Sequence, residues 1–260
     1  MKQQISMADA LKRGGRLLLG TASALILTVL SACTAGPALV DTSIDSTTPV
    51  TQNRDYATYD WETRHQEILA RHEVLNPEVI YLGDSITHFF GGEPKAPLAW
   101  GSDAWKALFE DITVTNMGFG WDRTENVIWR LQNGEIDEIS PKVALIMIGT
   151  NNLSIDNSPA DIFSGVEVIV DEIHARSPLT HIMLLGILPR KDKQSEPRQT
   201  NARLRELALR EYVEFIDTRP VLLDAEGKLD QAKLRDAVHI NESGYSALSK
   251  LLRPLLLKKL

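Results

Sequence analysis

The chain has 260 residues, of which 43% are hydrophobic and 24% are charged, a composition typical of globular proteins. Its formal net charge of -7 and the lack of basic runs interleaved with aromatic residues argue against nucleic acid as a partner. The sequence shows no Gly-rich phosphate loop and no metal-ligand spacing, so it predicts neither a cofactor nor a metal site.

The first 32 residues have the features of a bacterial export signal. A mostly apolar run from residue 17 to 30 is shorter than the roughly 20 residues of a membrane-spanning helix. It ends in Leu30-Ser31-Ala32-Cys33, which resembles the lipobox of bacterial lipoproteins, whose cysteine becomes the acylated N-terminus. Four basic residues precede the run: Lys2, Lys12, Arg13 and Arg16. Translation from Met7 would still leave three of them.

Cys33 is the only cysteine of the chain, so it cannot form an internal disulfide, and lipidation gives it a role. The alternative is an ordinary cleaved signal peptide with an incidental cysteine. Residues 33–53 are rich in Thr, Ser, Pro and small residues, which predicts a flexible tether that leads to one domain over residues 54–260. By analogy with lipoprotein sorting, Thr34 favours the periplasmic face of the outer membrane. The sequence indicates no oligomeric state.

The domain is expected to begin with a helix between residues 56 and 75. Its two histidines, His65 and His72, are interpreted as surface residues, because no Cys or carboxylate accompanies them at metal-ligand spacing. Val79–Leu82 is a short apolar run, typical of a strand buried on both faces. It leads directly into Gly83-Asp84-Ser85, a turn that presents a serine hydroxyl.

Four further apolar runs predict strands that alternate with helical segments. Such alternation predicts a parallel sheet with helices on both faces and right-handed crossovers, which gives a three-layer α/β/α sandwich around five strands. The further strands are expected at 112–115, 143–148, 182–188 and 213–216. The remaining helices are expected at 104–109, 124–132, 159–176, 197–210 and 245–257.

Polar residues follow the ends of the first three expected strands and recur near the C-terminus. Because the carboxyl ends of parallel strands meet at one edge of a sheet, these residues should converge there. The blocks are Gly83-Asp84-Ser85, Asn116-Met117-Gly118, Gly149-Thr150-Asn151-Asn152 and Asp236-Ala237-Val238-His239.

In this order, the blocks resemble those of the SGNH, or GDSL, hydrolase family, whose fold is flavodoxin-like. The four named residues of the family correspond here to Ser85, Gly118, Asn151 and His239, and Asp236 stands three residues before the histidine. Residues 116–152 are most similar to the catalytic subunits of platelet-activating-factor acetylhydrolase and their bacterial relatives. The chain departs from the extended GDSL pattern only conservatively, with Ile86 after the serine in place of Leu.

The resemblance implies that Ser85 is the nucleophile, that His239 is its general base and that Asp236 orients the imidazole. It implies three oxyanion donors, namely the backbone N–H groups of Ser85 and Gly118 and the side-chain amide of Asn151.

Neighbouring polar residues receive other interpretations. Asp84 is expected to bind turn amides rather than to join the triad, Asn152 to hold a turn, and His88 to be packed or solvated. Trp121 and Arg190 lie near predicted strand ends and are candidate substrate contacts.

The sequence therefore predicts a lipid-anchored serine esterase of the bacterial cell envelope. It would hydrolyse short acyl esters, with acetyl favoured, of a small molecule, glycan or lipid through an acyl-enzyme and without a metal. Two alternatives remain open. One is an O-acyltransferase with the same triad, and the other is a non-catalytic glycan-binding lipoprotein that has kept the scaffold.

Overall fold

The computed structural model describes residues 45–54 and 58–260. The predicted signal segment, the predicted lipidation site Cys33 and the predicted tether up to residue 44 lie outside the described residues. Within the described ranges, no helix is long and apolar enough to cross a membrane.

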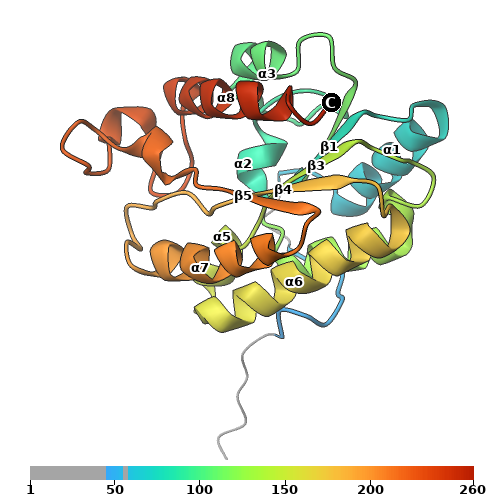
Figure 1. Cartoon of the computed structure of the whole chain (residues 1–260), viewed down its shortest axis with the longest axis horizontal. Coiled ribbons are helices and arrows are strands. Elements are labelled where there is room, and N and C mark those ends of the chain that lie inside the picture. The colour runs from blue at the N-terminus through green and yellow to red at the C-terminus, as the bar shows by residue number, and fades with distance from the viewer. Residues whose placement is uncertain (1–44, 55–57) are drawn as a thin grey trace, which may run out of the picture. The chain divides into compact units, whose positions relative to one another are not determined.

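A five-stranded parallel sheet forms the centre of the domain (Figure 1). Its strands lie in the order β2-β1-β3-β4-β5, so the chain first builds outward from β1 on one side and then on the other. In open α/β sheets, ligands bind where the strand order reverses, which here is at the carboxyl ends of β1 and β3. The strands are β1 (Val79–Gly83), β2 (Val114–Gly118), β3 (Val143–Met147), β4 (His181–Leu185) and β5 (Val213–Ile216).

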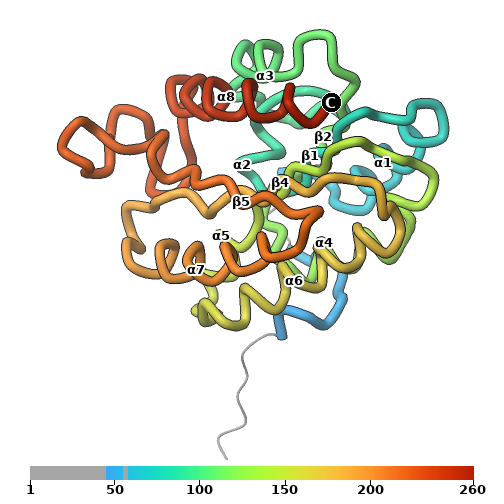
Figure 2. The backbone as a smooth tube through the Cα atoms, viewed as in Figure 1, coloured from blue at the N-terminus to red at the C-terminus, as the bar shows by residue number. Residues whose placement is uncertain are grey.

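Helices cover both faces of this sheet, which confirms the predicted three-layer α/β/α fold (Figure 1). One face packs against α1 (Trp61–Val74), α4 (Thr124–Arg130), α6 (Pro159–Arg176) and α7 (Glu196–Leu204). The other face packs against α3 (Ser102–Leu108) and α8 (Glu242–Leu256), which lie together in Figure 2. Each face buries a continuous apolar cluster, the dominant favourable contribution to folding.

Two short helices follow strand ends, namely α2 (Ser85–His88) after β1 and α5 (Thr150–Ser154) after β3. The remaining short elements are the π-turn η1 (Leu131–Glu135) after α4 and the 3-10 turns η2 (Arg205–Leu209) after α7, η3 (Arg219–Leu222) and η4 (Gln231–Lys233).

Local capping explains where the long helices begin. Ser158 accepts a hydrogen bond from the Asp161 amide, and Pro159 follows at the first helical position, so α6 starts where the sequence predicts. Asn241 accepts hydrogen bonds from the amides of Ser243 and Gly244, which starts α8 three residues before the predicted Tyr245.

The second strand lies further along the chain than predicted, because its polar residue is satisfied inside the sheet. Asn116 is fully buried, and its side-chain amide donates to the carbonyl oxygens of Thr87 and Gly91 at 2.8 and 2.6 Å. A buried polar side chain is tolerated when its hydrogen bonds are made, so β2 extends to Gly118 instead of ending at Thr115.

The two histidines of α1 are buried, which corrects their interpretation as surface residues. His65 Nδ1 lies 2.9 Å from Oε1 of Glu135, and His72 Nδ1 lies 3.0 Å from the backbone oxygen of the same glutamate. The π-turn η1 carries Glu135 beneath α1, and the sequence of α1 alone does not predict this partner.

Part of the predicted tether is packed on the domain. Gln52 is buried and donates hydrogen bonds to Asp122 Oδ1 at 2.6 Å and to the Gly120 carbonyl at 3.0 Å. The backbone N–H of Val50 reaches the carbonyl of Glu125 at 3.3 Å. The tether prediction is therefore wrong for residues 45–53, because these long-range hydrogen bonds order a segment whose composition alone suggests flexibility.

Candidate active site

Three side chains from the two ends of the domain form one hydrogen-bonded chain. Ser85 is the first residue of α2, directly after β1, and its side chain is largely buried. Its Oγ lies 2.8 Å from Nε2 of His239, and Nδ1 of the same imidazole lies 2.8 Å from Oδ2 of Asp236. With the proton on Nδ1, the imidazole donates to the carboxylate, and Nε2 accepts from the serine hydroxyl.

The loop that carries the acid and the base is closed by its own backbone. Oδ1 of Asp236 accepts the N–H groups of Val238 and His239 at 2.8 and 2.7 Å. Partial burial alone would raise the pKa of Asp236, but the hydrogen bonds from these amides lower it overall. The carboxylate is therefore charged at neutral pH and able to stabilise an imidazolium.

The loop before α3 reaches the imidazole of His239. The ring of Trp100 stands 5.3 Å from the His239 ring at 75°, an edge-to-face contact. The guanidinium of Arg235 lies over the same indole, 4.5 Å from its centroid. Trp100 thus forms one wall beside His239, the predicted general base.

Hydrogen bonds made by Asp84 and Tyr245 hold the turn that presents Ser85 in place. Asp84 accepts the Ile86 amide at 2.9 Å, which confirms its turn-binding interpretation, and burial raises the pKa of its carboxyl to about 7. Tyr245 of α8 donates its hydroxyl to the Ile86 carbonyl at 2.7 Å. These contacts from two directions fix the start of α2.

His88 is packed beneath the site rather than lining it. Its side chain is fully buried, and Nδ1 accepts the amide N–H of Gly120 at 3.1 Å. Burial, together with the charges of Arg64 and Arg130, lowers the pKa of His88 to about 2, so the imidazole is a neutral acceptor.

Asn151 lies in α5 at the end of β3, the strand next to β1. Its Nδ2 donates to the backbone oxygen of Asp122 at 2.9 Å, which uses one of the two amide hydrogens and leaves the second for a ligand. Its neighbour Asn152 holds the turn, as predicted: Oδ1 accepts the Thr124 amide at 3.1 Å and Nδ2 contacts Asn157.

Gly118, whose backbone N–H is the third predicted oxyanion donor, is the last residue of β2, and that role stays a prediction. Its N–H already donates to Oδ1 of Asn116 at 2.8 Å, and its place in the sheet is beside Gly83, two residues before the serine. A Cβ atom at position 118 would stand 2.3 Å from the backbone nitrogen of His88. Glycine is therefore required here for close packing of β2 against α2.

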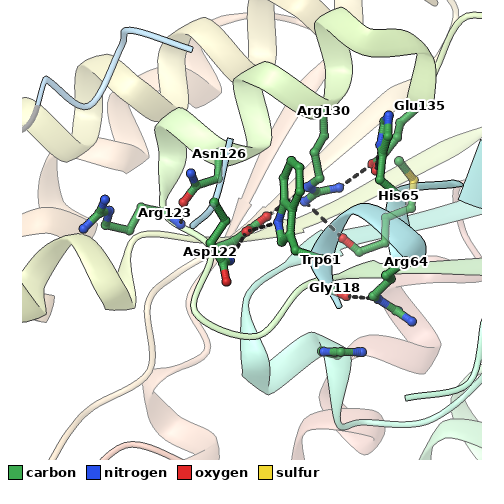
Figure 3. Close-up of polar contacts among 12 residues, drawn as sticks. Trp61, Arg64, His65, Gly118, Asp122, Arg123, Asn126, Arg130 and Glu135 are labelled. Atoms are coloured by element: carbon green, nitrogen blue, oxygen red, sulfur yellow. Dashed lines mark hydrogen bonds and ion pairs between the residues drawn. The ribbon is translucent and has the colours of Figure 1, made fainter. Parts of the chain in front are cut away.

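A buried ionic network lies under this edge of the sheet, as Figure 3 shows. The Asp122 carboxylate accepts from Trp61 Nε1 at 2.8 Å and from Arg130 Nε at 2.9 Å. Arg130 also pairs with Glu135, which in turn contacts His65 (Figure 3). Burial raises the pKa of Asp122 to about 6, although the charge of Arg130 opposes this shift.

This network fixes the backbone that supports Asn151, and sequence reasoning missed it. Asp122 lies two residues before α4, whose N-cap is Arg123, and Arg130 is the last residue of that helix. Because the two residues do not share the helix, helical periodicity could not predict their pairing.

Of the two candidate substrate contacts, only Trp121 projects from the protein. It is 44% exposed and has φ of 68°, a conformation that bulky residues rarely adopt and that is concentrated at functional sites. Arg190, by contrast, is buried and bonded to Asp192, to the Thr150 carbonyl and to Ser154. Among the described residues, no group of three or more His, Cys, Asp and Glu side chains is placed to hold a metal ion.

Comparison with known proteins finds one consistent group of relatives. The model of the GDSL-like lipase/acylhydrolase family matches residues 81–247. Platelet-activating factor acetylhydrolase IB subunit alpha2 of Homo sapiens is 31% identical over 205 residues, which cover 77% of this chain and 85% of that protein. Subunit alpha1 of Bos taurus is 30% identical over 205 residues, with 77% and 84% covered.

Solved structures share the fold at lower identity. A GDSL-like lipase from Bacteroides thetaiotaomicron superimposes with a TM-score of 0.61 at 17% identity and covers 75% of this chain and 98% of that one. A carbohydrate acetylesterase from Sinorhizobium meliloti gives a TM-score of 0.55 at 15% identity, with 69% and 98% covered.

Proposed function

The chain belongs to the GDSL-like lipase/acylhydrolase family and is an ester hydrolase, and we propose that it cleaves short acyl esters through an acyl-enzyme on Ser85. The observation that carries this proposal is the continuous hydrogen-bonded chain from the Ser85 hydroxyl through His239 to Asp236. A serine hydroxyl needs a base within hydrogen-bond distance to become a nucleophile, and this geometry supplies one.

In the proposed reaction, Ser85 Oγ attacks the ester carbonyl carbon while its proton passes to Nε2 of His239. The new C–O bond gives a tetrahedral intermediate, and its collapse breaks the bond to the alcohol, which leaves with the proton held on the imidazole. Water then attacks the acyl-enzyme, with His239 again as base, and releases the carboxylic acid. Asp236 stabilises the imidazolium in both steps.

Two donors are proposed for the negative charge that develops on the carbonyl oxygen. One is the backbone N–H of Ser85 at the start of α2, where helix amides have no intrahelical acceptor. The other is the second hydrogen of the Asn151 amide, whose first hydrogen is held by Asp122. Each such donor typically contributes about 10²–10³ in rate.

Acetyl is the proposed acyl group. The relatives at 30% and 31% identity are named as acetylhydrolases, which supports a small acyl group. The named lipid substrate of those relatives is not carried over, because one fold and one triad serve many alcohols.

The test uses the purified full chain and p-nitrophenyl esters of two, four and eight carbons. We expect the acetate to be cleaved with the highest kcat/KM and Ser85→Ala to lose this activity, whereas Ser102→Ala on the exposed start of α3 should retain it. Hydrolysis that survives in Ser85→Ala would overturn the acyl-enzyme. Transfer of acetyl to an added glycan in preference to water would assign the same triad to an acyltransferase.

A further inference from the structure

A cavity opens at the carboxyl end of the sheet, beyond the side chains of Ser85 and His239. Its volume is about 480 Å³, and residues after β4, the start of α7, η3 and the hairpin of residues 223–229 line it. Of the residues that the sequence singles out for the site, only Arg190, a candidate substrate contact, lines it, and Ser85, Asn151, Asp236 and His239 do not. The size is within the range of small-molecule sites.

The charge of this cavity opposes that of the whole chain. Four cationic side chains line it, and no Asp or Glu does, although the chain carries a net charge of -7. The four are Arg190, Arg198, Arg219 and Lys228. Like charges that face one space repel each other, so an anion that enters would relieve this repulsion.

Two of these cations have no partner in the described part of the chain. The side chains of Arg219 and Lys228 make no hydrogen bond and no ion pair with described residues. The hydrogen bonds at these positions are made by backbone groups, namely the two amides and the Lys228 carbonyl. The nearby carboxylate of Asp224 accepts the amides of Glu226 and Lys228, so its own turn uses it. Both cationic groups are available to a ligand.

The other two cations, Arg190 and Arg198, already make contacts with the protein. Arg190 is paired with Asp192 at 2.6 Å and holds the wall of the cavity. Arg198 donates its Nε to the Gln194 carbonyl at 3.2 Å, which leaves the two terminal nitrogens of its guanidinium. A guanidinium fork suits the paired oxygens of a carboxylate or phosphate.

The cavity shares a wall with the catalytic site. Arg190 Nη1 donates to the Thr150 carbonyl at 2.7 Å, next to Asn151. The adjacent Lys191 amide donates to the Ala237 carbonyl at 2.9 Å, inside the loop that holds Asp236 and His239. The segment after β4 therefore contacts both halves of the catalytic site and also lines the cavity.

The distance between the two sites suits one substrate. Strands β4 and β5 stand two and three places from β1 in the sheet order, which corresponds to roughly 10–14 Å at the usual strand spacing. An ester of a one- or two-ring alcohol bound at Ser85 spans such a distance.

We propose that this cavity binds an anionic group, a carboxylate or a phosphate, on the alcohol part of the ester substrate. The inference rests on the proposed function, since it assigns the alcohol that leaves from Ser85. It predicts that acetylated acidic sugars or sugar phosphates are better substrates than matched neutral esters, because Arg219 and Lys228 hold the charged end while the ester lies at the serine.

A kinetic experiment with the full chain tests the proposal. Three acetylated methyl glycosides that differ only at C6 are compared: a glucoside, a glucuronoside and a glucoside 6-phosphate. We expect kcat/KM to be about tenfold higher for at least one charged ester than for the neutral one. In R219Q/K228Q this ratio should fall close to one. The control K250Q, a cation on α8, should keep the ratio.

A binding experiment separates this inference from the proposed function. Full-length Ser85→Ala is titrated calorimetrically with glucuronate, inorganic phosphate and methyl glucoside. We expect one of the two anions to bind, binding to weaken as salt is raised, and R219Q/K228Q in the same background to lose it. Anion binding without esterase activity would leave the cavity assignment intact while the proposed function fails. Equal binding of the neutral glycoside, or an unchanged ratio in R219Q/K228Q, would overturn the assignment.

Discussion

The side-chain amide of Asn151 donates a hydrogen bond to the backbone carbonyl of Asp122, 2.9 Å away. Through this contact, a residue at the end of β3 is oriented by a turn after β2, and the buried pair of Asp122 and Arg130 holds that turn in place. The amide is thus oriented by the protein itself, as the proposed role of Asn151 in oxyanion stabilisation requires.

Adjacent asparagines give the first prediction. Asn151→Ala should lower kcat for p-nitrophenyl acetate by about 10²–10³-fold, because one oxyanion donor is lost. Asn152→Ala should instead lower stability by about 1–3 kcal/mol, because it leaves the buried Thr124 amide unpaired. Rate measurements and urea unfolding on both variants test whether Asn151 acts in catalysis and Asn152 in stability. A larger loss of kcat in Asn152→Ala would contradict it.

The buried network gives the second prediction. Arg130→Met leaves the carboxylates of Asp122 and Glu135 buried without their cation, so unfolding free energy should fall by about 3–5 kcal/mol. Arg176→Met is the control. It removes a partly exposed arginine that also pairs with two carboxylates, and should cost only about 0–1 kcal/mol. Urea titrations measure both changes, and similar losses would show that burial does not set the cost.

The third prediction concerns pH and His88. Its pKa is about 2 in the folded protein but near 6.5 in an unfolded chain, so the unfolded state binds a proton first as pH falls. The stability that the neutral imidazole contributes is complete above pH 6.5 and is lost toward lower pH. From pH 6.5 to 5, wild type should therefore lose about 2 kcal/mol more than His88→Gln.

Comparison with this variant is needed because two buried acids act in the opposite direction. The raised pKa values of Asp84 and Asp122, about 7 and about 6, destabilise the folded state as pH rises from about 4. They are present in both proteins, so their contribution cancels in the difference. Unfolding free energies that change in parallel for wild type and His88→Gln would refute the assignment to His88.

The fourth prediction concerns the proposed lipid anchor at Cys33. Wild type expressed in a Gram-negative host should incorporate labelled fatty acid and fractionate with the outer membrane, because several acyl chains give stable attachment. Cys33→Ala should incorporate no label and leave the membrane fraction. Membrane association that is unchanged in Cys33→Ala would rule out the lipobox.

The elements that sequence could place are those whose cause is local. Apolar runs gave all five strands, and Ser158-Pro159 gave the start of α6, since capping involves neighbours in the chain. β2 was misplaced because Asn116 reads as a strand end, whereas its side chain is satisfied by carbonyls of residues 87 and 91. The burial of His65 and His72 was missed for the same reason, because their shared partner, Glu135, lies far from them in the sequence.

By itself, the sequence determined the fold class and the family, and it predicted that Ser85, Asp236 and His239 come together, because apolar periodicity and short motifs are local properties of the chain. Only the tertiary structure decided that Gly118 serves packing, that Asn151 is anchored by Asp122, and that residues 45–53 lie on the domain. It also gathered the four cations beside the catalytic loop. Each of these features depends on contacts between residues that are far apart in the chain. Hydrogen bonds and charge interactions depend on distance in space, and distance in space cannot be read from separation along the sequence.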